Sequence, residues 1–459
     1  MKKTSLLWQT LSLCTWFAIT DTSQEGPVNQ RSSSVCEDCL ILTPFINNGS
    51  VEIARELSKV THEEFLGIES YSAFVTVNDA YDSNIFFWFF PARAKNATET
   101  PWIIWLQGGP GISSLLGVFN LHGPFVISEN KVSLRNLTWT EDYSVLYIDN
   151  PVGTGFSFTG DDHGYTTNEE QVGEQLLEFL NQFLKVFPEL KSRPLFIAGE
   201  SYAGKYVPAL GHQIQKQRHC CHHDINLKGL MIGNGLVDPL SMLHHSELVR
   251  VLGVLTDEQS EAVGAIQSEA AKYVKAGRMV DAAQKFNESI EYIKHHSSVD
   301  IMNMNKNPTT SGYGFRDFLE RADIRKALHV SNVSFDVDNQ LVYEKMLPDF
   351  MNSTKSWVEE LLEDYGVLSY SGQLDLLLPY WGSKHLYSSL QWSGREQYQK
   401  SPKILLRLTE DGPVVGYKKT GGNFTEVLIR NAGHMVPKES PRVAKFMLDD
   451  FIQEYASVQ

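Results

Sequence analysis

The stretch around Ser201 constrains the fold most, because it combines a strand, a sharp turn and the start of a helix. An apolar run over residues 194–198 stops at Gly199, and the serine follows two residues later. Ala203 and Gly204 come next, so residues with little or no side chain flank the serine. This is the G-x-S-x-G pattern of a nucleophile elbow, with Ala203 at the second small position. An elbow holds the hydroxyl above the carboxyl end of a sheet, so a buried strand must precede the serine and a helix must follow it.

Short apolar runs of strand length recur along the chain. The first two, residues 73–77 and 85–90, are rich in aromatic and β-branched residues with polar residues between them, which favours a hairpin. Thr167 and Glu170 form a capping-box pattern ahead of an apolar stripe, which predicts a helix. Strands that alternate with helices predict an α/β fold with a mostly parallel sheet covered on both faces. The runs that follow the hairpin are residues 102–106, 145–148, 195–198 and 230–232.

The pattern changes near residue 238, where strand-like runs give way to charged, helical segments. Thr256 and Gln259 form a second capping box, and residues 315–328 predict a further helix. A helical insertion of this kind commonly caps the site at the carboxyl end of the sheet. We therefore expect a core in two parts, residues 71–237 and 354–459, with a mostly helical cap over 238–353. In the second part, strands are expected at residues 366–370, 404–408, 414–417 and 427–429, and a last helix at 437–455.

The N-terminal region predicts passage through the secretory pathway. Residues 1–20 have two lysines followed by an apolar segment, as in a signal peptide, and residues 21–70 are polar and uneven, as in an N-terminal extension or propeptide. No later run is apolar for the length of a membrane span, so none is expected. Seven glycosylation sequons also favour a secreted or lysosomal protein. They are Asn48, Asn96, Asn136, Asn287, Asn332, Asn352 and Asn423.

Charge and cysteine content exclude some functions. The net charge of −15 argues against a nucleic-acid partner, which requires a basic face. Four cysteines remain after the signal segment, and three disulfide connectivities are possible. Cys36 and Cys39 lie in a polar segment, which favours a structural bridge over a redox motif. Cys220 and Cys221 lie in a His- and Cys-rich stretch, residues 219–223, where adjacent ligands cannot easily close a metal site, so no metal is expected.

Two loops could supply the partners that a serine nucleophile requires. Asp375 follows the expected strand 366–370, and His434 follows the expected strand 427–429. The order Ser, Asp, His, with separations of 174 and 59 residues, fits an α/β hydrolase and differs from the orders in chymotrypsin and subtilisin. His244 and His245 are expected to be helix-capping or surface residues.

An oxyanion hole is expected directly after the strand at residues 102–106. The run Gly108-Gly109-Pro110-Gly111 allows backbone N–H groups to turn toward the nucleophile, and we assign the hole to the N–H groups of Gly109 and Tyr202. A phosphate cradle would require a Lys-Ser/Thr pair that is missing here. No cofactor is expected.

Five ordered motifs resemble those of the serine carboxypeptidases, over roughly residues 70–455. The closest resemblance is to the vitellogenic-carboxypeptidase-like branch. It implies an α/β-hydrolase fold with a helical insertion, no cofactor, and removal of single C-terminal residues from peptides or proteins with a free C-terminus, best at acid pH. The motifs lie at residues 105–111 with Ser113 and Ser114, at 147–157, 199–208, 233–235 and 433–437.

The resemblance also implies roles for individual residues. Ser201 is then the nucleophile, His434 the base and Asp375 its orienting acid. Gln107 and Glu200 would bind the terminal carboxylate of the substrate, with one carboxyl of the pair protonated, which links binding to low pH.

Further residues shape the expected pocket for the departing residue. Met435 would line it, and Leu121 stands where the family usually has a glutamate that partners Glu200. Loss of that neighbour should lower the pKa of Glu200, whereas desolvation by the leucine should raise it. Ile112 replaces the small residue or cysteine that often follows the Gly-Pro-Gly run.

Two alternatives to the carboxypeptidase remain open. One is a related acyltransferase that passes the acyl group to an alcohol or amine instead of water. The other is a catalytically weak binding protein on the same scaffold, which the change at Leu121 permits. The oligomeric state does not follow from the sequence.

Overall fold

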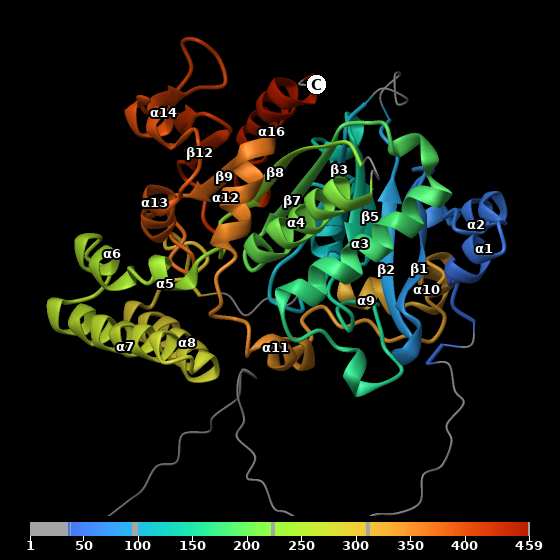
Figure 1. Ribbon diagram of the computed structural model, residues 1–459, viewed down its shortest axis with the longest axis horizontal. Helices are drawn as coiled ribbons and strands as arrows, with labels where there is room; N and C mark the ends of the chain where they lie inside the picture. The colour runs from blue at the N-terminus through green and yellow to red at the C-terminus, as the bar shows by residue number, and fades with distance from the viewer. Residues whose placement is uncertain (1–34, 37, 94–99, 222–224, 309–312, 458–459) are drawn as a thin grey trace, which may run out of the picture. The chain divides into compact units, whose positions relative to one another are not determined.

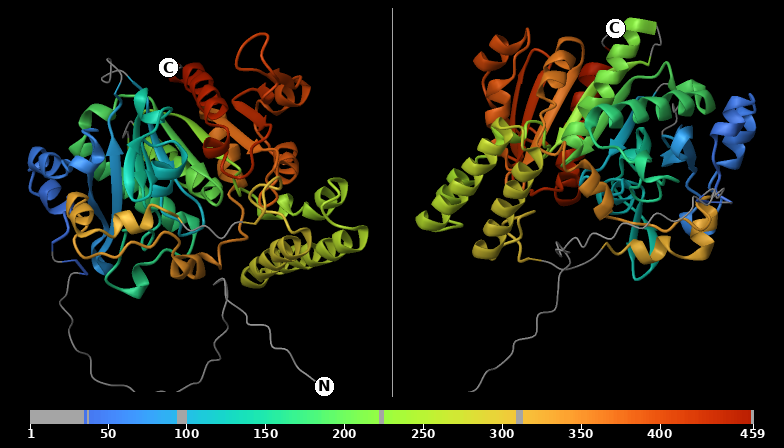
Figure 2. Two further views of the ribbon diagram at one scale, coloured as in Figure 1. Left: turned by 180° about the vertical axis from the view of Figure 1, so that it is seen from behind. Right: turned by 60° about the horizontal axis from the view of Figure 1, so that its bottom comes forward.

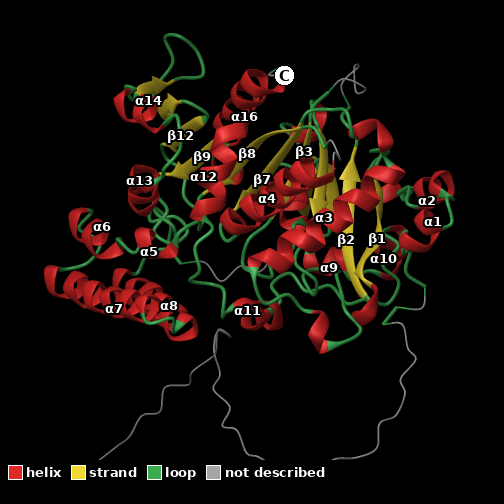
Figure 3. Cartoon of the chain, viewed as in Figure 1, coloured by secondary structure: helices red, strands yellow, loops and turns green. Residues whose placement is uncertain are grey.

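A ten-stranded sheet organises the chain (Figure 1, Figure 3). The computed structural model describes residues 35–36, 38–93, 100–221, 225–308 and 313–457, with the side chain of Cys221 excepted. The strand order is β1-β2-β6-β3-β7-β8-β9-β12-β11-β10. The strands are β1 (Tyr71–Asn78), β2 (Ser83–Phe90), β3 (Trp102–Leu106), β6 (Ser144–Ile148), β7 (Leu195–Glu200), β8 (Leu227–Gly233), β9 (Gly366–Gly372), β10 (Ile404–Leu406), β11 (Gly416–Gly421) and β12 (Phe424–Ile429).

The six central strands, from β6 to β12, pair in parallel, and both margins of the sheet are antiparallel. The prediction of a mostly parallel sheet is therefore confirmed. Each expected strand is present, with ends that differ by a few residues. A separate hairpin, β4 (Phe125–Ser128) with β5 (Lys131–Leu134), was not expected from the sequence.

Helices cover both faces of the sheet (Figure 1, Figure 2). Trp102 and Ile104 of β3 point into one hydrophobic cluster, which includes residues of α3 (Glu169–Val186), α4 (Ala203–Cys221) and α12 (Lys355–Asp364). Their neighbours Ile103 and Trp105 point into a second cluster, with residues of α16 (Pro441–Ala456). Burial on both faces explains why these strands are continuous apolar runs.

The start of α3 differs from the predicted capping box. Asn168, in an extended conformation, is the N-cap, and its side chain accepts a hydrogen bond from the N–H of Gln171 at 3.0 Å. The N–H of Thr167 instead donates to the side-chain oxygen of Gln171 at 2.8 Å. The capping role predicted for Thr167 with Glu170 is therefore wrong, because the helix begins one residue later.

The segment before β1 is integrated into the fold. It contains α1 (Thr43–Asn47) and α2 (Val51–Leu57). The N–H of Leu42 donates to the carbonyl of Phe74 in β1, and the N–H of Phe74 donates to the carbonyl of Leu40. Cys36 and Cys39 form a disulfide with each other, a pairing that the sequence left open. The signal segment 1–20 and residues 222–224 lie outside the described residues.

The insertion between β8 and β9 of the core contains helices α5 to α11. Its two long helices, α7 and α8, pack side by side as a hairpin (Figure 1). The capping box of Thr256 with Gln259 is confirmed. The single helix expected over residues 315–328 is wrong: the extended backbone of Arg321 separates two short helices. The helices are α5 (Pro239–Met242), α6 (His245–Val251), α7 (Asp257–Lys275), α8 (Met279–Ser297), α9 (Arg316–Leu319), α10 (Ala322–Ala327) and α11 (Gln340–Met346).

The irregular part of the insertion touches loops at the carboxyl ends of the strands. Asp336 exchanges backbone hydrogen bonds with Gly155 after β6, and the N–H of Ser113 donates to the carbonyl of Val337 at 2.9 Å. The N–H of His434 donates to the carbonyl of Met302 at 2.7 Å. These contacts place the insertion over the edge of the sheet where Ser201 lies.

The second part of the core ends in two helices where one was expected. Ser440 interrupts the helix between α15 (Val436–Glu439) and α16, and Pro441 starts the second one. The other helices of this part are α13 (Tyr380–Ser389) and α14 (Arg395–Lys400). None of the helices in the described ranges is long and apolar enough to cross a membrane.

The sequons fall into two groups. Those at Asn48, Asn136 and Asn332 are exposed. In the second group the asparagine is half-buried and its side-chain amide donates a hydrogen bond. Asn287 donates to Tyr343, Asn352 to Asp349, and Asn423 to the carbonyl of Leu362. Asn96 lies outside the described residues. Glycosylation stays a prediction, and the exposed group is the more accessible.

The cap of α3 gives a direct stability test. We expect Asn168→Ala to destabilise the protein by about 1 kcal/mol, because the N–H of Gln171 loses its acceptor. The neighbouring control Thr167→Ala should change stability by less than about half of that. Urea unfolding of the two variants measures the difference, and a larger loss for Thr167→Ala would contradict the assigned cap.

Candidate active site

Ser201 lies between β7 and α4 with its backbone in the left-handed region. Its φ is 67°, which is uncommon for a residue with a Cβ. Hydrogen bonds hold both of its backbone polar groups: its N–H donates to Gly233 at 3.0 Å, and its carbonyl accepts from Gly204 and Leu236. The predicted strand, turn and helix start are all present at this position.

The loop after β3 packs directly against the serine turn. A Cβ at Gly108 would lie 2.4 Å from the backbone nitrogen of Tyr202 and 2.7 Å from the carbonyl oxygen of Glu200, so only glycine fits there. Gly109 follows with a φ of 117°. Within the described part of the chain, neither the N–H of Gly109 nor that of Tyr202 donates a hydrogen bond. Both are therefore available to an oxyanion.

Asp149 holds this loop in place through hydrogen bonds, a role that the sequence analysis did not predict. Its carboxylate accepts hydrogen bonds from the hydroxyl of Ser113 at 2.6 Å and from the N–H groups of Ser114 and Phe156. Burial raises the pKa of Asp149 to about 7, although these hydrogen bonds act in the opposite direction.

His434 and Asp375 are brought together from separate loops and are both buried. Nδ1 of His434 lies 2.7 Å from Oδ2 of Asp375, and Oδ1 of Asp375 accepts from the N–H groups of Leu377 and Leu378. Burial alone would lower the pKa of His434, but the charge and hydrogen bond of Asp375 raise it above 6.5 overall. Nε2 of His434 has no hydrogen-bond partner in the described residues. In structures without a substrate, the hydrogen bond between a catalytic serine and its histidine is often long or poorly aligned and tightens only when the substrate binds.

Asn234 is a site residue that sequence reasoning missed. Its side-chain amide donates to Oδ2 of Asp375 at 2.6 Å and its oxygen accepts from the N–H of Gly372 at 3.2 Å. The same carboxylate oxygen therefore contacts both His434 and Asn234. The Gly-Asn-Gly run at residues 233–235 was the available signal, but a run of this kind does not indicate where the amide points.

Glu200 is buried beside Gln107. Nε2 of Gln107 donates to Oε1 of Glu200 at 3.1 Å, and Trp105 donates to Oε1 of Gln107 at 3.2 Å, which fixes the orientation of the amide. Oε2 of Glu200 has no hydrogen-bond partner among the described residues. Burial raises the pKa of Glu200 to about 7, against smaller opposing effects of His434 and the Gln107 hydrogen bond. Desolvation thus outweighs the other influences on this carboxyl.

Leu121 and Met435 belong to one apolar region. Leu121 is buried in the second hydrophobic cluster, at the end of the short π-helical segment Gly117–Leu121, and Met435 packs against that cluster half-buried. The segment also contacts α15, which starts directly after Met435. His245, expected to be a capping or surface residue, is buried instead, because its ring bonds to Gln267 and to the carbonyl of Leu377.

Comparisons with known proteins agree on one family. A family model described as serine carboxypeptidase matches residues 60–454. The venom serine carboxypeptidase of Apis mellifera is 39% identical over 424 residues, which cover 90% of each chain. The vitellogenic carboxypeptidase of Aedes aegypti is 38% identical over 441 residues, covering 93% of this chain and 92% of that protein.

Relatives and structures extend the same likeness. A human protein named probable serine carboxypeptidase CPVL is 36% identical over 433 residues, covering 90% of this chain and 89% of its own length. The crystal structure of a prohormone-processing carboxypeptidase from Saccharomyces cerevisiae superposes with a TM-score of 0.78 at 22% identity. That match covers 87% of this chain and 96% of the yeast chain, and shows that the fold is an α/β hydrolase.

Asn234 provides a test of the site's geometry. We expect Asn234→Ala to lower the rate at which a fluorophosphonate labels Ser201 by roughly 10- to 100-fold, because Asp375 loses a hydrogen bond to a charged group. Asn226→Ala, which removes a hydrogen bond to Ser192 at the opposite end of β8, is the control and should label at the parent rate. Equal rates for the two variants would show that Asn234 does not position the acid.

Proposed function

Because the chain belongs to the serine carboxypeptidase family, we propose that its serine-type carboxypeptidase activity runs through Ser201, His434 and Asp375. The observation that carries this proposal is the buried Glu200, directly before Ser201, with one carboxyl oxygen that has no hydrogen-bond partner among the described residues. A carboxyl in this position can recognise the free C-terminus of a peptide next to the bond that Ser201 attacks.

In the first half of the reaction, the Ser201 hydroxyl attacks the carbonyl of the last peptide bond while His434 accepts its proton. Asp375 keeps Nδ1 of His434 protonated and stabilises the imidazolium that forms. The N–H groups of Gly109 and Tyr202 stabilise the oxyanion. His434 then protonates the departing nitrogen, so a free amino acid leaves and an acyl group remains on Ser201.

In the second half, water takes the place of the departed amino acid. His434 removes a proton from the water, the resulting hydroxide attacks the acyl ester, and the shortened peptide leaves as Ser201 regains its proton. Protons therefore pass only between Ser201, His434, the departing nitrogen and water.

Glu200 links binding to pH. A carboxylate substrate can accept a hydrogen bond from Glu200 only while Glu200 carries a proton, and Gln107 supplies a second donor or orients the acid. The pKa of Glu200 is raised to about 7, so the proton is present in acidic solution and is lost as the pH rises through that value. Activity best at acid pH is the consequence.

The apolar region around Leu121 and Met435 would accommodate the departing residue. Both side chains are hydrophobic and belong to the cluster beside the loop after β3. We expect uncharged departing residues to be favoured on this side, because a charged side chain would lose its hydration there.

Several features support residence in the secretory pathway. The disulfide of Cys36 and Cys39 is typical of an oxidising compartment. Exposed sequons and the signal-like residues 1–20 agree with secretion or lysosomal residence. One relative is named as a venom protein.

A pH series on blocked dipeptides tests the function and the role of Glu200 together. In the parent protein, KM for release of the C-terminal amino acid should rise as the pH passes about 7, where Glu200 loses its proton. In Glu200→Gln, which keeps a donor at every pH, that rise should vanish.

The companion variant is Leu121→Glu, which introduces a carboxyl at the position of the usual family glutamate. The resemblance to the family implies that this carboxyl lies near Glu200, where a second negative charge should raise the pKa of Glu200 and move the rise in KM to higher pH. A pH-dependent KM that persists unchanged in Glu200→Gln would contradict the carboxylate-binding role, and failure of the parent to release any amino acid would contradict the function.

A further inference from the structure

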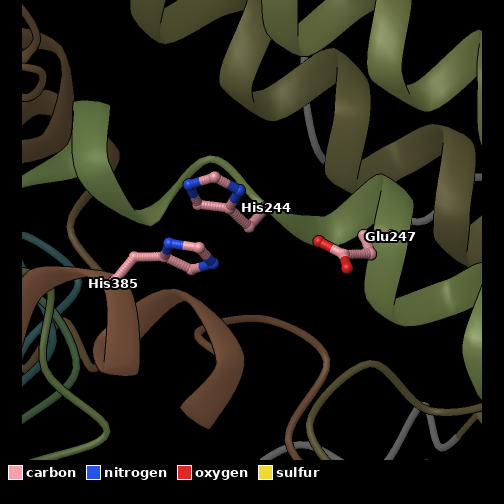
Figure 4. A group of neighbouring side chains, drawn as sticks. All are labelled: His244, Glu247 and His385. Carbon is pink, nitrogen blue, oxygen red and sulfur yellow. The ribbon is translucent and has the colours of Figure 1, made fainter. Parts of the chain in front are cut away.

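Three potential metal ligands meet where the insertion contacts the second part of the core. His244 precedes α6, Glu247 lies on α6, and His385 lies on α13 (Figure 4). One ligand atom from each residue lies within 4.8 Å of the others. The two histidines are separated by 141 residues in the sequence, so the fold, and no local motif, brings them together.

The ring nitrogens of both histidines have no hydrogen bond to the described residues, although the ring of His385 also packs edge-on against Trp381, with ring centroids 5.5 Å apart. The two histidine rings stack with centroids 3.7 Å apart and planes 12° from parallel. Both side chains are half-buried. The carboxylate of Glu247 is oriented by the indole N–H of Trp381, which donates to Oε2 at 3.2 Å from the same helix as His385. A carboxylate held by an indole donor resembles the outer-shell support that metal ligands receive.

We propose that His244, Glu247 and His385 bind one divalent transition-metal ion, with Zn²⁺ as the best-fitting ion. Two imidazoles and one carboxylate are a ligand set that zinc accepts, with a fourth position left for water. Ligand atoms around tetrahedral zinc lie roughly 3.4 Å apart, since each bond is about 2.0–2.1 Å long. The three ligand atoms must therefore close in by about an ångström, and one stacked ring must turn so that both lone pairs face the ion.

The surroundings permit a cation. The nearby Lys384 lies over the Trp381 ring at 4.9 Å, and Arg250 is paired with Asp257 and Glu261 on α7. Neither cation is paired with Glu247 in the described structure.

A bound ion would fasten the insertion to the core close to the catalytic acid. His245, adjacent to the first ligand, hydrogen-bonds the carbonyl of Leu377, whose N–H donates to Asp375. The ion would thus hold the start of α6 against α13 beside the loop that carries Asp375. Its expected effect is on stability, because the ligands do not touch the reacting atoms.

The experiment uses the untagged full-length protein stripped of metal with a chelator and titrated with Zn²⁺ at neutral pH. Elemental analysis after dialysis should find one zinc ion per chain, and Tm should rise with zinc concentration. His385→Ala and His244→Ala should abolish both effects. The matched control is the double variant His295→Ala with His296→Ala, which removes two exposed histidines from α8 and should bind zinc as the parent does.

A second measurement avoids substitutions. Diethyl pyrocarbonate modifies accessible imidazoles, and peptide mass spectrometry maps the modified residues. Zinc should protect His244 and His385 while His295 and His296 stay reactive. Absence of a zinc ion, zinc retained at full occupancy in His385→Ala, or equal reactivity of His385 with and without zinc would each overturn the site.

Discussion

The left-handed backbone of Ser201 is the constraint on which the rest of the site depends. A residue with a Cβ is disfavoured there by roughly 1 kcal/mol or more, so the surrounding structure has to hold it. The carbonyl of Gly233, at the end of β8, accepts a hydrogen bond from the N–H of Ser201. The carbonyl of Ser201 accepts hydrogen bonds from the N–H groups of Gly204 and Leu236. Gly108 leaves room for this turn, because a residue with a side chain at that position would collide with the turn. The parallel order of β3, β7 and β8 is what brings these three segments to one point.

The same sheet edge concentrates buried acids. Asp149 orders the loop after β3, Asp375 bonds to His434, and Glu200 directly precedes Ser201, and each of these acids is nearly without solvent contact. Their environments differ: Asp375 accepts hydrogen bonds from Asn234 and two backbone N–H groups, whereas one oxygen of Glu200 accepts none among the described residues. Asp375 is thereby held in place beside a histidine, whereas Glu200 is suited to take up a proton. The insertion also contacts this edge: the carbonyl of Met302 accepts a hydrogen bond from the N–H of His434, which is buried.

Patterns with a local physical cause were predictable from the sequence. The strand Trp102–Leu106 was placed at its observed bounds because burial on both faces makes it uniformly apolar, and the turn at Ser201 was marked by its small neighbours. Features set by tertiary contact were not predictable. Asn234 acts on Asp375 across 141 residues, His245 is buried by Gln267 and Leu377, and residues 315–328 divide at Arg321 without a proline or glycine to mark the break. Thr167 and Asn168 are adjacent and both are good N-cap residues, so composition alone does not show at which of them the helix begins.

The most direct test of the central claim is to trap the acyl-enzyme. A blocked depsipeptide, in which an ester replaces the bond to be cleaved and the C-terminal carboxylate stays free, is mixed with the protein and quenched in acid within the first turnover. The digest is analysed by mass spectrometry. The peptide containing Ser201 should gain the mass of the blocked acyl residue, attached as an ester to that serine. Turnover of the ester with no adduct on Ser201, or with the adduct on another residue, would contradict the central claim.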